Sequence, residues 1–366
     1  MNKIIYLDAA ATAQKSPAMI DVQTAFLRGT VANAGRGICA PSAAVDDMVA
    51  ATRARVADFI CASPRQIVFT SGTTDAMNRI AQIVREHINT VAVSDLDHHS
   101  ARLPFEQMAV SRGARVVVMP LDKYFDIDAS AAVCADVAVI TAMSNVLGQP
   151  QDVGAIVRAL RAKNPHVITV VDAAQYVAHD AIDVKAWDCD FLCFSGHKIG
   201  ADTGIGVMYV RDPDRWGPVR FGGGMVSRIT PGGEIIPQPA PDCYEAGTLP
   251  LTQIAGLVPA IDAWCAWDGG RDVREYIYDA LVQMSGVRLL TRRDAAMISF
   301  VTPDMHPLDF GARAGARGLC LRVGNMCATW IHRAMWIDGS VRISNGPWNT
   351  MADAADTVRI VREVLK

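Results

Sequence analysis

Two groups of polar residues follow apolar runs near the middle of the chain, and their residue types could do chemistry together. The run from His166 to Val171 leads into Asp172, and the run from Cys189 to Phe194 leads into Ser-Gly-His-Lys, which ends at Lys198. If both runs are buried strands of one sheet, they deliver a carboxylate and an amine to the same sheet edge. A lysine amine can add to an aldehyde, and a carboxylate can keep a ring nitrogen protonated.

This is the arrangement that a pyridoxal phosphate (PLP) enzyme needs. The segments Asp172–Gln175 (Asp-x-x-Gln) and Ser195–Lys198 (Ser-Gly-His-Lys) together resemble the class V aminotransferase family. Within it, the chain resembles the cysteine desulfurases, and most closely those of the SufS-like (group II) type. The resemblance runs from Tyr6-Leu7-Asp8 to the last helix. It implies a PLP-dependent transferase fold (fold type I), with Lys198 as the Schiff-base lysine.

A phosphate site is implied by residues of two turns. Thr73 and Thr74 stand where a strand meets a helix, and free N–H groups at a helix N-terminus bind anions. Helix capping alone would explain a Gly-Thr-Thr segment equally well, but the desulfurases bind the cofactor phosphate at this place. The resemblance adds Ser195 and His197 as phosphate ligands. It also implies that Thr248 reaches the phosphate of a neighbouring subunit, which requires a homodimer.

The PLP ring and its substituents would contact other residues. Gln175 can donate to the phenolic oxygen, while Asp172 could alternatively be a helix N-cap. The resemblance places His98, the first of a His-His pair, over the ring, where it can move protons; an exposed loop histidine is the alternative. Asn145, in a Ser-Asn-Val-Leu-Gly segment, would contact substrate or cofactor, or could be a plain turn residue.

The reaction itself depends on Cys327. Arg322 precedes it by five positions and Arg342 follows it by 15, which are the intervals of SufS-like desulfurases. The resemblance implies that Arg342 binds the substrate α-carboxylate through a bidentate pair. We also predict that Arg322 binds the substrate, and its charge could supply a cationic environment for the thiol. Cys327 would then attack the sulfur of bound cysteine to give a persulfide and alanine. A buried, inert cysteine and a surface arginine are the alternatives.

Three positions depart from the family pattern near the site. Gly35 stands where histidine is usual, Asn325-Met326 replaces His-His before Cys327, and Ala328-Thr329-Trp330 lacks a proline. Each departure removes a proton carrier or a constraint on the loop.

Composition excludes several classes of protein. The 366 residues are 51% hydrophobic and include 35 basic and 38 acidic residues, so the composition shows no excess of positive charge of the kind that binds nucleic acids or membranes. No apolar run is long enough for a transmembrane helix, and the first eight residues lack the apolar core of a signal peptide. We therefore expect a cytoplasmic protein. The nine cysteines form neither a disulfide framework nor a Cys-x-x-Cys metal pair.

The elements that must position these residues alternate along the chain. Strand-like apolar runs separated by helical patterns predict an α/β fold with a mainly parallel sheet. We predict a large PLP-binding domain at 15–257, and a smaller α+β domain made of 1–14 and 258–366 that carries the Cys327 loop. The Gly- and Pro-rich segment from Phe221 to Pro241 is predicted to be a long loop, and Leu319 to Val323 a single strand.

These observations favour a cysteine desulfurase that passes sulfur from L-cysteine to an acceptor protein, for iron–sulfur clusters or another thiolated product. A selenocysteine lyase, a carbon–sulfur lyase or an aminotransferase would use the same lysine and arginine without a catalytic Cys327. A degenerate scaffold is the third alternative, and the intact set of Lys198, Asp172, Gln175 and Arg342 argues against it.

Overall fold

Seven strands make up the main sheet of the protein, whose computed structural model describes residues 3–29, 32–35 and 37–366. Met1 and Asn2, at the start of the N-terminal segment, and Arg36, beside Gly35, lie outside the described residues. In spatial order the strands are β2 (Ile67–Thr70), β8 (Gly206–Val210), β7 (Phe191–Ser195), β6 (Ile168–Asp172), β5 (Val137–Thr141), β3 (Thr90–Ser94) and β4 (Arg115–Met119). Only β8 runs antiparallel to its neighbours. The prediction of a mainly parallel sheet is confirmed.

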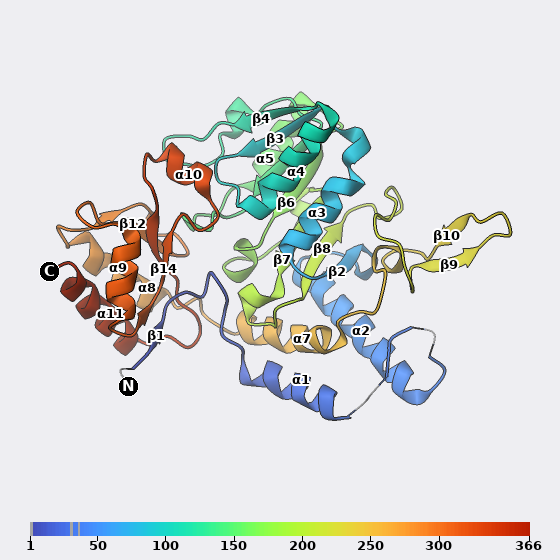
Figure 1. Ribbon diagram of the computed structural model, residues 1–366, viewed down its shortest axis with the longest axis horizontal. Coiled ribbons are helices and arrows are strands. Elements are labelled where there is room, and N and C mark those ends of the chain that lie inside the picture. The colour runs from blue at the N-terminus through green and yellow to red at the C-terminus, as the bar shows by residue number, and fades with distance from the viewer. Residues whose placement is uncertain (1–2, 30–31, 36) are drawn as a thin grey trace.

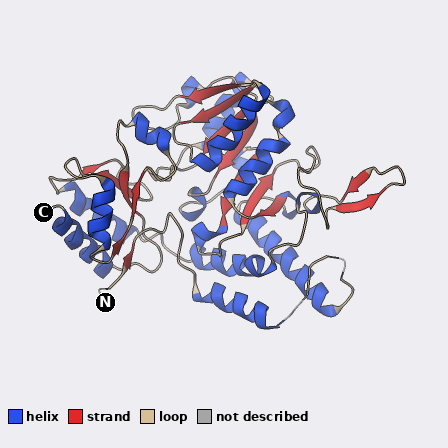
Figure 2. Ribbon diagram, in the orientation of Figure 1, coloured by secondary structure: helices blue, strands red, loops and turns tan. Residues whose placement is uncertain are grey.

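Both faces of the main sheet are buried at its central strands, whereas the edge strand β4 is largely exposed. Val170 and Cys193 pack in one apolar cluster, whereas their chain neighbours Val171 and Leu192 pack in another. Successive side chains of a strand point to opposite faces, so a strand that is apolar throughout must be covered on both sides. Figure 2 shows helices on either side of these strands. Polar side chains are thereby concentrated near the strand ends.

Helices connect and cover the strands. They are α1 (Pro17–Gly29), α2 (Ala40–Phe59), α3 (Thr73–Ile83), α4 (His99–Arg112), α5 (Val153–Lys163), α6 (Val184–Trp187), α7 (Leu251–Cys265), α8 (Arg271–Val282), α9 (Pro307–Gly315), α10 (Thr329–Ala334) and α11 (Met351–Val364). None of these described helices is long and apolar enough to span a membrane. The predicted domain boundary at residue 257 falls within α7 and stays a prediction.

A second, antiparallel sheet holds the C-terminal part of the chain. Its order is β11 (Arg288–Leu289), β12 (Ile298–Val301), β15 (Ser340–Ile343) and β14 (Arg322–Gly324). Beside it, β1 (Ile5–Tyr6) pairs in parallel with β13 (Leu319–Cys320), and both chain ends lie at this side of the molecule (Figure 1). The predicted single strand from Leu319 to Val323 is wrong, because the chain changes partner after Cys320: β13 pairs with β1, and β14 pairs with β15.

The predicted long loop from Phe221 to Pro241 contains a β-hairpin instead. Its strands β9 (Val226–Ile229) and β10 (Ile235–Pro237) are antiparallel, and the hairpin projects from the body of the molecule (Figure 1). The Pro-Gly-Gly segment after Thr230 is its turn, in which Gly233 adopts a φ of 85°. The strands are largely exposed, so they lack the apolar pattern by which buried strands are predicted.

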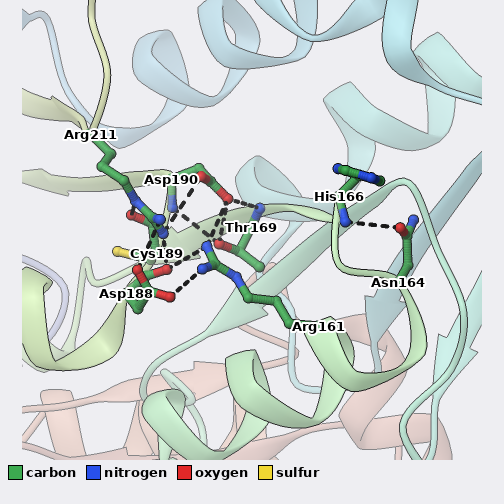
Figure 3. A network of polar contacts seen from close by, with 8 residues as sticks. All are labelled: Arg161, Asn164, His166, Thr169, Asp188, Cys189, Asp190 and Arg211. Carbon is green, nitrogen blue, oxygen red and sulfur yellow. Dashed lines mark hydrogen bonds and ion pairs between the residues drawn. The ribbon is translucent and has the colours of Figure 1, made fainter.

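A network of charged groups joins the amino ends of β6 and β7 (Figure 3). Asp188 pairs with both Arg161 and Arg211. Asp190 accepts hydrogen bonds from the backbone N–H and the hydroxyl of Thr169, both at 2.9 Å, which fastens the start of β7 to the start of β6. This edge of the sheet is thus closed by ion pairs made within the chain.

Candidate active site

The opposite edge of the same two strands carries the predicted lysine and carboxylate. β6 ends at Asp172, whose register partner on β7 is Cys193, two residues before the end of that strand at Ser195. A single 3₁₀ turn, Gly196–Ile199, then presents Lys198. The parallel register therefore brings both groups to the carboxyl ends of the two strands, which is where open α/β sheets bind ligands.

The predicted phosphate-binding turns meet at this edge. The backbone N–H of Thr73, the first residue of α3, donates to the Ser195 hydroxyl at 2.8 Å, and the two hydroxyl oxygens lie 2.9 Å apart. The close approach of β8 to the turn before α3 needs glycine at both places. A Cβ on Gly206 of β8 would lie 2.5 Å from the Cα of Gly72, and Gly72 has a φ of 147°. Hydroxyls and the N-terminus of an 11-residue helix thus converge on one point.

A cavity of about 320 Å³ lies between these turns and the C-terminal sheet. It gathers twelve of the thirteen predicted site residues: Thr73, Thr74, His98, Asn145, Asp172, Gln175, Ser195, His197, Lys198, Arg322, Cys327 and Arg342. The remaining residue, Thr248, lines a separate cavity of about 280 Å³ together with Asn33, Gly35 and Arg53. Thr248 therefore does not join the other predicted phosphate ligands within one chain.

The Lys198 amine is held by two backbone carbonyls. Its Nζ donates to the oxygens of Ala10, at 2.7 Å, and Ala11, at 3.1 Å. Burial and the nearby Arg342 lower its pKa to about 8, and Asp172 opposes this shift. A larger fraction of this amine is unprotonated at neutral pH than for an ordinary lysine, so it is prepared to add to an aldehyde.

Asp172 is buried, and its Oδ1 accepts a hydrogen bond from the Ala174 N–H at 2.9 Å. Burial raises its pKa to about 6, while this hydrogen bond and Lys198 oppose the rise. The group is mainly ionised at pH 7 and can stabilise a protonated ring nitrogen. Gln175, three residues further along, donates through Nε2 to the Ala10 oxygen at 2.9 Å.

Two histidines at the cavity are uncharged at neutral pH. Burial, with Lys198 as the next cause, lowers the pKa of both His98 and His197 to about 4. The His98 Nδ1 lies 2.7 Å from the Ser100 hydroxyl, which fixes the ring at the start of α4. A neutral imidazole in this position can accept or pass on a proton.

Several buried polar atoms around the cavity have no hydrogen-bond partner among the residues that the structure describes. They are Asn145 Oδ1, Gln175 Oε1, His197 Nδ1 and Arg342 Nε. Buried polar groups are normally paired, so atoms of this kind mark a place built for a polar ligand. The amine, the carboxylate and the hydroxyl-lined helix terminus match the aldehyde, pyridine nitrogen and phosphate of PLP. The residues present therefore fit this cofactor.

Cys327 lies in a tight, well-anchored turn. The Ala328 N–H donates to the Asn325 oxygen at 2.8 Å, and the two residues between them, Met326 and Cys327, have φ values of 51° and 55°. This left-handed conformation is unfavourable for residues other than glycine, by about 1–2 kcal/mol each. The turn is held by Asn145 Nδ2, 2.9 Å from the Met326 oxygen, so the Cys327 thiol is both exposed and fixed at the cavity.

The neighbouring His99 adds a second anchor for this turn. Its backbone N–H donates to the Cys327 oxygen at 2.8 Å, and its Nε2 lies 3.0 Å from the Thr329 hydroxyl. Trp330 packs edge-to-face against the His99 ring. The segment that departs from the family pattern is thus ordered by contacts with α4.

The two predicted arginines share a carboxylate that sequence reasoning missed. Arg342 Nη2 lies 3.0 Å from Asp8 Oδ1, and Arg322 Nη2 lies 2.7 Å from Asp8 Oδ2. Arg322 is thus paired with Asp8 while it lines the same cavity as Cys327, and its roles toward the substrate and the thiol stay predictions. Asp8 is part of the Tyr-Leu-Asp motif, and an acid at the end of a short apolar run is the signal that could have identified it.

Comparison with known proteins places the chain in a family. Residues 5–356 match the family described as Aminotransferase class-V. The chain is 33% identical over 368 residues to a probable cysteine desulfurase of Pseudomonas putida, covering 95% of this chain and 90% of the relative. It is 32% identical over 383 residues to a cysteine desulfurase of Yersinia pestis, covering 99% and 94%.

Solved structures agree with this placement. The chain superimposes on the cysteine desulfurase CsdA of Escherichia coli with a TM-score of 0.91 at 29% identity, covering 99% of this chain and 94% of that one. A cysteine desulfurase of Thermococcus onnurineus gives a TM-score of 0.92 at 27% identity, with the same coverage. The α/β fold predicted from the alternating strands and helices is therefore that of PLP-dependent cysteine desulfurases.

Proposed function

The chain belongs to the class V aminotransferase family, whose members depend on PLP, and we propose that it is a cysteine desulfurase that converts L-cysteine to L-alanine. The sulfur is held as a persulfide on Cys327 for transfer to an acceptor. One observation carries the proposal: the exposed Cys327 lines the same cavity as Lys198, Asp172 and Arg342. A thiol at this place is needed for desulfurase chemistry and has no role in transamination.

Each residue has a task that follows from its surroundings. Lys198 would hold the cofactor through its amine, and Asp172 would stabilise the protonated ring nitrogen; when bound, PLP would supply the electron sink for reactions at the substrate α- and β-carbons. Arg342 binds the α-carboxylate. The neutral imidazole of His98 can accept and return a proton.

Sulfur transfer takes place at Cys327. Its sulfur, as the thiolate, attacks the substrate sulfur, so that a sulfur–sulfur bond forms as the carbon–sulfur bond breaks. The electron pair of the broken bond stays with the carbon, which gains a proton to give alanine. The anchored turn keeps the attacking atom at the cavity, which reduces the entropy lost in reaching the substrate.

We assign the chain to the SufS-like type of desulfurase. The intervals that separate Arg322, Cys327 and Arg342 support this, as does the short, ordered turn that carries the cysteine. An acceptor protein, with iron–sulfur cluster assembly as one destination of the sulfur, and a cytoplasmic location complete the proposal. A persulfide is short-lived under oxidising conditions, which suits a reducing compartment.

A homodimer is part of the same proposal. Thr248 lies away from its own cavity, in a hollow shared with Gly35, and is available to a second subunit. The segment that precedes it is anchored by Glu245, which forms a buried bidentate pair with Arg53 and accepts the Phe69 N–H at 2.6 Å. Glu245 thus connects the segment that carries Thr248 to β2. In the same chain, β2 leads into the predicted phosphate-binding turn at Thr73.

Cysteine turnover with a cysteine variant tests the function. We expect the purified holoenzyme to release equimolar alanine and, with a thiol reductant, sulfide. Cys327→Ala should lower this turnover by about 10²-fold or more while the absorbance of bound PLP is retained. Cys134→Ala, which removes an exposed thiol elsewhere, is the matched control and should have no effect.

The other results separate the alternatives. Turnover that survives in Cys327→Ala would indicate a lyase in which this cysteine is not catalytic. Bound PLP without alanine production from cysteine would indicate a selenocysteine lyase or an aminotransferase. Failure to bind PLP would leave only the scaffold.

A further inference from the structure

Asp8 is a buried acid that bridges two arginines of the active-site cavity. Its two carboxylate oxygens pair with different guanidinium groups: Oδ1 accepts a hydrogen bond from Arg342 Nη2 at 3.0 Å, and Oδ2 forms an ion pair with Arg322 Nη2 at 2.7 Å. Asp8 is 7% exposed and Arg342 is 2% exposed, whereas the Arg322 side chain is 46% exposed. The carboxylate thus connects an arginine deep in the cavity to one at its mouth.

The Arg342 guanidinium is oriented by two acceptors. Nη1 donates to the Asn145 backbone oxygen at 2.7 Å, and Nη2 donates to Asp8. The buried Nε has no hydrogen-bond partner in the described part of the chain. Because a guanidinium is planar and its N–H groups diverge at fixed angles, fixing one N–H on each Nη fixes the direction of those that remain. These remaining N–H groups are the ones available to a substrate carboxylate.

The backbone around Asp8 is itself held in place, by contacts with Ser344 and Tyr6. It forms a parallel bridge with Ser344, two residues beyond Arg342, and the Ser344 hydroxyl accepts from the Ala10 N–H at 2.9 Å. The Tyr6 hydroxyl lies 3.2 Å from the Asp8 backbone oxygen and 2.8 Å from that of Thr12. The carboxylate is therefore a fixed point against which the arginines are aligned.

The charges around the cavity show why an acid is needed here. Among the described residues, Arg342, Arg322 and Lys198 are the cationic residues that line the cavity, and Asp172 is the acid that lines it; Asp8 pairs with the two arginines without lining the cavity itself. Burial lowers the pKa of His98 and His197 to about 4, so both are neutral at pH 7. Arg322 and Arg342 each disfavour the protonated Lys198 amine, whereas Asp172 and Asp8 favour it. Without Asp8, two guanidinium groups would face each other with no shared counter-ion.

We infer that Asp8 is the positioning residue for substrate carboxylate recognition: it aligns Arg342 and holds Arg322 beside it as a pair. This inference rests on the proposed function and deepens it. The ligand class is the α-carboxylate of an amino acid. Asp8 acts through the arginines and does not itself contact the reacting atoms.

The test compares the wild-type holoenzyme with Asp8→Asn, Asp8→Glu and a matched control. Asp188→Asn is the control, since Asp188 also bridges two arginines, but at the far edge of the sheet. In Asp8→Asn the amide can accept from one guanidinium but presents an N–H to the other. We expect the KM for cysteine to rise at least about tenfold, with a smaller change in kcat.

A spectroscopic titration supplies a readout that does not depend on the substrate. The pH midpoint of the absorbance change of bound PLP reports the proton on the Lys198 nitrogen. Because Asp8 favours the protonated form, Asp8→Asn should move this midpoint to lower pH, and Asp8→Glu should restore it. Asp188→Asn should leave both the KM and the midpoint as in the wild type.

Each other outcome overturns the inference. An unchanged or lower KM in Asp8→Asn would show that Asp8 only competes with the substrate for Arg342. An equal rise in the KM for cysteine in Asp188→Asn would show that a general loss of stability, rather than positioning of Arg342, is responsible. If the wild type binds PLP but does not turn over cysteine, the proposed function fails, and the absorbance midpoints alone then decide the role of Asp8.

Discussion

Acidic and basic side chains lie at both ends of strands β6 and β7, but among the residues that the structure describes they form ion pairs with each other only at the amino ends. At the amino ends, Asp188 and Asp190 pair with Arg161 and Arg211 (Figure 3). At the carboxyl ends, Asp172 and Lys198 have shifted pKa values and make no ion pair with each other among the described contacts.

The difference separates stability from function on a single pair of strands. Paired charges at the amino ends satisfy one another and fasten the strands together. At the carboxyl ends, burial without pairing keeps Asp172 and Lys198 reactive, at a cost in folding free energy. Perturbed groups of this kind gather at functional sites, and Asp172 and Lys198 both lie at the carboxyl ends of these two strands.

The largest expected effect comes from Lys198→Ala. Loss of the amine removes the attachment of PLP, so turnover should fall by about 10³-fold or more, and the absorbance of covalently bound cofactor should disappear. The thermal midpoint of the apoprotein should change little, because removal of a buried amine whose charge is disfavoured offsets the loss of its hydrogen bonds to the Ala10 and Ala11 oxygens. A large drop in that midpoint would mean that Lys198 also stabilises the fold.

Asp172→Asn should affect activity and stability in opposite directions. Without the carboxylate on the ring nitrogen, turnover should fall by about 10²-fold. The raised pKa, about 6 against 3.8, means that the ionised group destabilises the fold above pH 6, and that this cost disappears as the pH falls toward 4. The apoprotein variant should therefore be more stable than wild type at pH 7, by about 1–2 kcal/mol, and equal to it near pH 4. Urea unfolding at the two pH values measures this, and a destabilised variant at pH 7 would contradict the contrast between the strand ends.

Asp188→Asn should show the reverse behaviour and the smallest effect on turnover. Asparagine tolerates the left-handed conformation of this residue, which has a φ of 54°. The variant therefore removes the ion pairs and keeps the backbone, and we expect a loss of about 0.5–2 kcal/mol in unfolding free energy with unchanged kcat and KM. The contrast would fail if this variant lost activity without losing stability.

The sequence predicted those parts of the site that end a buried strand. Lys198, Asp172 and Thr73 each follow an apolar run, and the parallel register then brings them to one edge by the geometry of the sheet. Cys327 was predicted through the resemblance, and the structure adds the turn that anchors it. Lys198, Asp172 and Thr73 could be predicted from the strand pattern because sheet topology determines their position, whereas Cys327 could not.

Other features depend on contacts between distant segments and could not be predicted in this way. The role of Asp8 appears only when β1 has paired with β13, which brings its carboxylate to Arg322 and Arg342. The hairpin β9–β10 is exposed and has no buried face, so its sequence resembles a loop. The single strand predicted at Leu319 is two strands in the structure, because its first half pairs with β1 and its second half pairs with β15.

The pairing of the first residues with the last sheet has a consequence for synthesis on the ribosome. The Ala10 N–H donates to the hydroxyl of Ser344, a residue 334 positions later, and the carbonyls of Ala10 and Ala11 hold the Lys198 amine. At about 5–20 residues per second, the N-terminal segment waits roughly 20–70 s for its partner to be made. The nascent chain can therefore build most of its main sheet before the cavity is closed, and the last wall of the active site is added only when translation is nearly complete.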